Sequence, residues 1–177
     1  MTSYPDAAVV AAPVSRPGTL LAAVGVAVVS ALAAVVEGVL FFAGGRGLAT
    51  DVAANAIAMI TGGSAESVKA DGGSLLAASA DEVQNTLQAR GIVAVVFGVL
   101  LLIVALLVLG GSTWSRVLVT IAGLLNAGVA LRIATDIEGG TGAIRGSAWL
   151  AVATGILVVV LAWLPANNRY AKARKAL

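Results

Sequence analysis

The chain has 177 residues, of which 59% are hydrophobic and 11% charged, with a formal net charge of +2 and a mean hydropathy of +1.00. A soluble domain carries about 25% charged residues, so this sequence has too few to cover a water-facing surface, and we expect it in a lipid bilayer. The small net charge excludes the basic footprint of a nucleic-acid-binding protein. Cys and His are absent, which excludes disulfides, a Ser-His-Asp triad and the usual haem, iron–sulfur, zinc and copper sites. We therefore expect no cofactor and no metal.

Four apolar stretches are long enough to cross a membrane, which takes about 20 residues. They lie at about 18–43, 91–109, 117–134 and 147–164. The first run exceeds the 7–15 apolar residues of a cleaved signal peptide, so we interpret it as a span. The sequence predicts an all-α integral membrane protein. Its four-helix bundle covers 18–164, with an N-terminal segment (1–17) before it and a tail (165–177) after it.

The first span, "SALAAVVEGVLFFAGG", contains one acid, Glu37. An ionisable residue inside a span is a functional-site hypothesis by default. Ser30, Ala34 and Gly38 repeat every four residues, a spacing of small side chains that lets helices approach closely. Glu37, next to this stripe, is therefore expected to face protein rather than lipid.

Three roles for Glu37 remain open. It could form a packing pair with a basic residue of the same chain, for which Arg132 is the first candidate and Arg90 the second. It could pair with a residue of another subunit. It could also serve in transport or as a proton relay.

Residues 44–90 form the one sizeable segment outside the predicted spans, expected to be a small helical cap. "TDVAANAIAMI" predicts a helix with Thr50 as N-cap. "SADE" fits a capping box from Ser79 to Glu82, whose helix continues into the second span for about 30 residues. One face of the first cap helix carries four apolar residues, namely Val52, Ala56, Met59 and Ile60. The segment is either a solvated connector, or this face packs on the projecting helix or on another protein.

The third span holds Asn126 near its middle, among small residues. This pattern predicts a close helix contact with an interhelical hydrogen bond. Arg132, about 120° away on the helix, addresses a different neighbour and extends to the headgroups if Glu37 points elsewhere. The hydroxyls of Ser30, Thr120 and Thr154 are expected to bond to their own helix backbone.

The basic residues predict an orientation through the positive-inside rule. The tail is basic and has no acid; its basic residues are Arg169, Lys172, Arg174 and Lys175. Seven of the nine acids lie in the two segments that face the other side. Both termini are therefore expected in the cytoplasm, with the cap outside the plasma membrane. The basic tail can also touch acidic lipid headgroups, and the richness in Ala, Val and Gly suggests a bacterial source.

Three classes of function follow. The first is a non-catalytic accessory or assembly subunit of a larger plasma-membrane complex, such as a respiratory or transport assembly. It would act through helix packing and cap contacts, with the bilayer and other membrane subunits as partners. The second is a small homo-oligomeric transporter or channel that uses Glu37. The third, with least support, is an enzyme acting on lipid, because no nucleophile–base set is visible.

Overall fold

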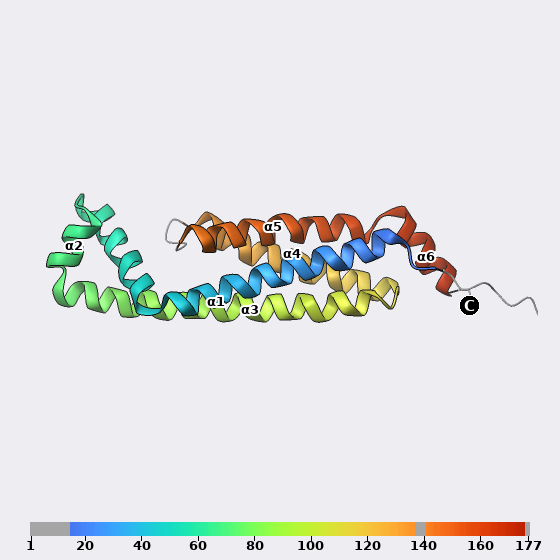
Figure 1. The fold of residues 1–177 in the computed structure, drawn as a ribbon, viewed down its shortest axis with the longest axis horizontal. Coiled ribbons are helices and arrows are strands. Elements are labelled where there is room, and N and C mark those ends of the chain that lie inside the picture. The colour runs from blue at the N-terminus through green and yellow to red at the C-terminus, as the bar shows by residue number, and fades with distance from the viewer. Residues whose placement is uncertain (1–14, 137–140, 176–177) are drawn as a thin grey trace, which may run out of the picture.

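The computed structural model describes residues 15–136 and 141–175, and the regular secondary structure of these residues is all helical. Six helices follow one another along these residues, and no strand occurs among them (Figure 1). They are α1 (Gly18–Thr61), α2 (Ala65–Asp71), α3 (Gly73–Val108), α4 (Thr113–Thr135), α5 (Gly142–Ala162) and α6 (Pro165–Lys175). The predicted all-α class is confirmed.

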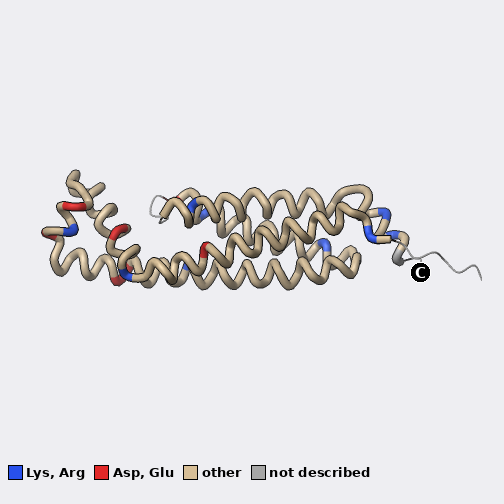
Figure 2. Tube along the Cα trace, viewed as in Figure 1, with Lys and Arg blue, Asp and Glu red and all other residues tan. Residues whose placement is uncertain are grey.

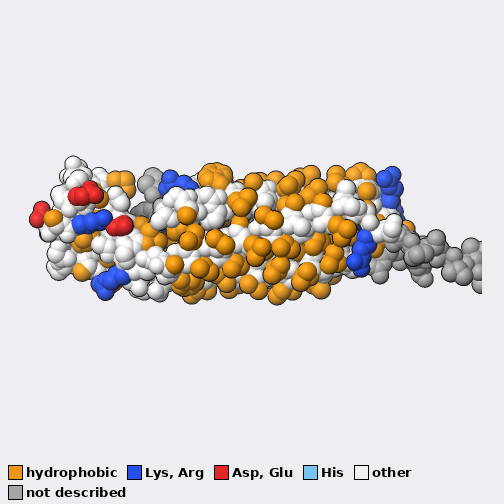
Figure 3. All heavy atoms as spheres, in the orientation of Figure 1, with side chains coloured by type: hydrophobic (Ala, Val, Ile, Leu, Met, Phe, Trp, Pro, Cys, Tyr) orange, Lys and Arg blue, Asp and Glu red, His pale blue; other side chains and the backbone are white. Residues whose placement is uncertain are grey.

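Four of these helices, α1, α3, α4 and α5, are long and apolar enough to cross a membrane. They run side by side along the long axis of the molecule (Figure 1). Their outward side chains form a broad apolar band, and the charged side chains lie towards the two ends (Figure 3). The prediction of four long apolar helices is confirmed, with α3 beginning 18 residues before the apolar stretch that defined the second span.

Small residues set how closely the helices pack. α1 packs most extensively on α3 and α5, and α4 on α5, whereas α3 and α4 share a smaller contact. A Cβ added at Gly38 of α1 would lie 2.5 Å from Val95 Cγ2 and 2.7 Å from the carbonyl oxygen of Gly91 on α3. A Cβ at Gly155 of α5 would lie 3.0 Å from the Ala127 Cβ on α4. These glycines therefore permit a backbone approach that larger residues would prevent.

Gly45 interrupts α1 with φ 47° and ψ −142°, a conformation that non-glycine residues rarely adopt. Beyond it, the rest of α1 leans away from the bundle (Figure 1). Together with α2 and the start of α3 it forms a projecting lobe, residues 46–85. The predicted N-cap at Thr50 is wrong, because this residue lies inside α1 and its hydroxyl donates to the Arg46 carbonyl oxygen at 2.8 Å.

The capping box predicted at Ser79 is also wrong, since Ser79 lies within α3. The capping box in this region is at Ser64 and Ser67, where each backbone N–H donates to the other residue's hydroxyl, at 3.2 Å and 3.1 Å. It starts α2, a helix that the sequence analysis did not predict. The continuity of α3 from the lobe into the bundle is confirmed; its 36 residues span about 54 Å at 1.5 Å per residue.

The lobe has a small core of its own. Four buried side chains meet between α1 and α3, namely Ala53, Ala54, Leu76 and Ala80. Two exposed ion pairs lie around it, Lys69 with Asp51 at 2.7 Å and Arg46 with Asp81 at 2.9 Å. Exposed ion pairs contribute little to the free energy of folding. The lobe is therefore held together mainly by apolar contacts between α1 and α3.

Candidate functional site

Glu37 is enclosed by the bundle. The residue is 1% exposed, and neither carboxyl oxygen has a hydrogen-bond partner among the described residues. One helical turn before it, Ala33 packs with residues of α4 and α5; one turn after it, Phe41 packs with a second group from the same helices. Acidic positions gather at the lobe end, and one lies within the bundle on α1 (Figure 2). The expectation that Glu37 faces protein agrees with this burial.

The expected pair between Glu37 and Arg132 is not formed. Arg132 Nη1 contacts Asp136 Oδ2 at 3.3 Å, and its side chain is 73% exposed. Arg90, the second candidate, also binds Asp136 Oδ2, at 2.7 Å. Asn126, 120° away from Arg132 on α4, faces α1, so Arg132 points out of the core.

Asp136 is a site residue that the sequence analysis missed. It ends α4, and two guanidinium groups share one of its carboxylate oxygens. A third guanidinium, that of Arg145 on α5, donates to its backbone carbonyl oxygen at 3.5 Å. The Arg132–Asp136 part could have been found from its i, i+4 spacing. Arg90 and Arg145 come from other helices, so only the fold brings them there.

A hydrogen-bonded chain crosses the bundle at Asn126. Asn126 Nδ2 donates to Ser30 Oγ at 3.2 Å, and Ser30 Oγ donates to the Ala151 carbonyl oxygen at 3.2 Å. All three residues are buried, and the chain links α4, α1 and α5. The predicted interhelical bond of Asn126 is confirmed. The expectation that Ser30 bonds within its own helix is wrong, whereas Thr120 and Thr154 do bond backward to Arg116 and Leu150.

The predicted small-residue stripe lies inside the structure. Ser30, Ala34 and Gly38 are all buried. Ala34 and Gly38 lie against α3, where an added Cβ at Gly98 would approach Ala34 Cβ at 3.2 Å. The stripe therefore packs α1 within the chain and is not available to another protein.

The four apolar residues predicted on one cap face divide into two groups. Val52 is buried and Ala56 half-buried, while Met59 is 62% and Ile60 87% exposed. The buried face of this helix continues through Ala53 and Ala54 instead. The lobe thus keeps two large adjacent apolar side chains outside its core.

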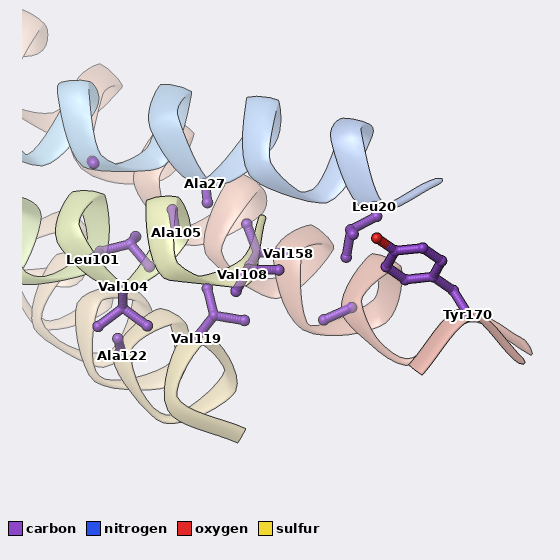
Figure 4. Packing of buried hydrophobic residues seen from close by; sticks show 12 residues of the cluster. Leu20, Ala27, Leu101, Val104, Ala105, Val108, Val119, Ala122, Val158 and Tyr170 are labelled. Atoms are coloured by element: carbon purple, nitrogen blue, oxygen red, sulfur yellow. The ribbon is translucent and has the colours of Figure 1, made fainter. Parts of the chain in front are cut away.

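At the other end of the bundle, the basic tail forms α6, which lies at an angle across that end (Figure 1). Tyr170 is buried and packs in the cluster that contains Leu20 of α1 (Figure 4). Asn167 accepts a hydrogen bond from Thr19 at 2.7 Å. Arg169 and Lys172 are exposed, and Arg174 and Lys175 complete the helix.

Arg116 lies beside this corner, one position before the third predicted span (117–134). It is buried, donates to Asn168 Oδ1 at 2.7 Å and stacks 5.6 Å from the centre of the Trp163 ring. The Trp163 indole N–H donates to Thr120 at 2.9 Å. These contacts hold α4 against the corner between α5 and α6, so Arg116 stabilises the packing of the helices.

Over residues 15–136 and 141–175, no three acidic side chains gather in an arrangement that could hold a metal ion. The chain matches no protein-family model, no curated protein and no solved structure. The fold therefore defines the class of the protein as a helical bundle with a projecting lobe. Four helices of the bundle are long and apolar enough to span a membrane.

Proposed function

We propose that the protein is a multi-pass membrane protein that serves as a non-catalytic accessory or assembly subunit of a larger plasma-membrane complex. The apolar band of Figure 3 supports insertion, because its exposed large side chains extend along all four long helices. Exposed Trp163, which follows the last residue of α5, fits the aromatic belt of a bilayer, and exposed Trp149 lies seven residues inside the other end of the helix. In the orientation that we propose from the basic tail, both termini are in the cytoplasm and the lobe is outside.

The exposed pair Met59 and Ile60 carries the proposal. The two residues lie on the part of α1 whose other face packs on α3. This packing fixes the helix, so both exposed side chains have a defined position. Large apolar side chains at the centre of a protein interface supply much of its binding free energy. The lobe therefore offers an attachment point for another extracytoplasmic surface.

The test is purification of the full chain from its native membrane in mild detergent, with native gels and mass spectrometry of co-purifying chains. We expect the wild type to migrate with larger partners. Burying one such side chain contributes about 1.5–3 kcal/mol, so Met59→Ser combined with Ile60→Ser should weaken retention of partners at least tenfold. Glu66→Ser, an exposed change on α2 of the same lobe, is the control. A wild-type chain that runs without partners would refute the proposal.

A second candidate is a small homo-oligomeric transporter or channel, and the unpaired burial of Glu37 favours it. A carboxyl group without a fixed partner can exchange protons or cations, whereas one held by an arginine cannot do so readily. The test is flux through the purified chain reconstituted alone in vesicles. Substrate- or proton-dependent flux that Glu37→Gln abolishes would establish this function in place of the first.

A further inference from the structure

A groove opens between α3 and α4, which share a smaller contact than the α1–α3, α1–α5 and α4–α5 pairs. Its volume is about 690 Å³, within the roughly 300–1,000 Å³ typical of small-molecule sites. Most of its lining is apolar, including Val93 on α3 and Leu124 and Leu125 on α4, all of which are exposed. The groove therefore opens on the apolar band rather than on the core.

Arginines close the groove at the lobe end. Arg90 and Arg132 both line it, and both bind Asp136. Arg145 reaches the same residue from α5. Among the described residues, two guanidinium groups therefore share the Asp136 carboxylate and a third contacts its backbone carbonyl oxygen.

No described acid lines the groove: Glu37 is buried in α1 beside Gly38, which packs on Gly91 next to Arg90. Glu82, eight residues and about 12 Å before Arg90 along α3, lines a separate neighbouring pocket together with Arg90. Asp81 is paired with Arg46. Among the described residues, the lining of the groove thus holds two arginines and no acid, and a phosphate group would complement these positive charges.

We infer that this groove binds one acidic phospholipid of the leaflet on the lobe side, with an acyl chain along Val93, Leu124 and Leu125 and the phosphate at Arg90 and Arg132. The inference rests on the membrane insertion proposed above and is independent of any partner protein. Leu125 and Arg132 are seven residues apart, about 10 Å along α4. An apolar channel of that length, ending in two arginines, fits a headgroup phosphate and the part of an acyl chain next to it. Arg132, with its side chain 73% exposed, is the mobile member that can turn from Asp136 to a phosphate.

The experiment is native mass spectrometry of the purified full chain with equal amounts of phosphatidylglycerol and phosphatidylcholine carrying the same acyl chains. The wild type should retain one phosphatidylglycerol with a preference of about tenfold, the scale expected from one or two basic residues near a membrane surface. Arg132→Gln should remove most of the preference. Arg169→Gln, an exposed charge on α6 at the other end, should leave it unchanged.

A second pair of variants tests the apolar part. A Cβ at Gly128, which lines the groove, meets no described atom within 4 Å, so Gly128→Leu can fill the groove without a clash and should release the lipid. Gly25 of α1 is also exposed, and an added Cβ there meets no described atom within 4 Å, so Gly25→Leu is the control and should not release the lipid.

Three results would overturn the inference. The first is equal retention of the two lipids, or retention that Arg132→Gln and Gly128→Leu leave unchanged. The second is displacement of the lipid by inorganic phosphate alone, which would mean an ion site without an acyl-chain groove. The third is a dimer in the same spectra that Gly128→Leu dissociates, which would mean that a second copy fills the groove. Failure of the partner-retention test with a bound acidic lipid would refute the subunit proposal alone.

Discussion

At the scale of single residues, the core accommodates two polar side chains in different ways. Asn126 is satisfied by Ser30, which in turn donates to the backbone of α5. Glu37 is equally buried and has no hydrogen-bond partner among the described residues. An unsatisfied buried polar group costs about 1–3 kcal/mol of folding free energy, so Glu37 reduces the stability of the bundle, whereas the Asn126 chain adds to it.

Glu37→Met is expected to stabilise the protein. It replaces the unsatisfied carboxyl group with an apolar side chain of similar length, and the gain should be about 1–3 kcal/mol in the free energy of unfolding. Reversible unfolding in mixed micelles measures it. Glu37→Gln, which keeps buried polar atoms, is the control and should gain less. A methionine variant less stable than the wild type would show that the carboxyl group has a favourable partner.

Glu37 and Arg132 are expected to act independently. Because Arg132 binds Asp136, the effects of Glu37→Gln and Arg132→Gln on the free energy of unfolding should add within about 0.5 kcal/mol. The same unfolding assay on both single variants and the double variant provides the cycle. A coupling energy above 1 kcal/mol would restore the direct pair that the sequence suggested.

Asn126 and Ser30 are expected to be coupled. The double-mutant cycle of Asn126→Ala with Ser30→Ala should give a coupling energy of about 0.6 kcal/mol and at most about 1.7 kcal/mol, the range found for hydrogen bonds between membrane helices. Asn126→Ala with Ser147→Ala is the matched control, since Ser147 donates to the carbonyl oxygen of Ile144 in its own helix. Equal coupling in both cycles would argue against the chain of hydrogen bonds across α1, α4 and α5.

At the scale of helices, one backbone break decides where α1 leaves the bundle. From Gly18 to Gly44 the helix can extend about 40 Å at 1.5 Å per residue, more than the roughly 30 Å of the hydrocarbon core. Gly45 then redirects the chain, so the remaining residues can fold back on α3 and form the lobe core. Without this break a straight α1 would carry Ala53 and Ala54 away from Leu76 and Ala80.

Gly45→Ala is therefore expected to destabilise the lobe. A side chain at φ 47° and ψ −142° is strained by about 1–3 kcal/mol. Limited proteolysis within residues 46–72 should become faster, and the free energy of unfolding should fall. Gly47→Ala is the control, because Gly47 is helical and an added Cβ meets no described atom within 4 Å. Equal proteolysis of the two variants would mean that the break does not hold the lobe in place.

At the scale of the whole molecule, the two ends differ in construction. One end carries the projecting lobe with its acids and the arginine cluster at Asp136. The other is closed by α6, which is docked through Tyr170 and Asn167 and has exposed Arg169 and Lys172. This asymmetry fits a protein that meets different surroundings on the two sides of a membrane.

The orientation can be tested with single cysteines, since the chain has none of its own. Ser74→Cys on the lobe should react with an impermeant thiol reagent in intact cells, because the lobe is expected outside. Lys172→Cys on α6 should react only after the membrane is permeabilised. Both positions are exposed, so burial does not limit either reaction. Labelling of Lys172→Cys in intact cells would reverse the proposed orientation.

The sequence by itself determined the class of fold. Long apolar runs satisfy their backbone groups only as helices in lipid, so composition and length were enough to place α1, α3, α4 and α5. Small-residue spacing also located the close packing at Ala34 and Gly38, and the position of Asn126 predicted its interhelical bond.

Only the tertiary structure decided which polar groups meet. Helical spacing assigns Glu37 and Arg132 to similar depths, but the rotation of α4 about its axis is fixed by packing against α1 and α5, and it turns Arg132 outward. The same packing brings Arg90, Arg145 and Asp136 together from three helices. The start of α2 and the break at Gly45 were likewise missed, because a glycine-rich sequence permits a turn at several positions and the lobe core selects one of them.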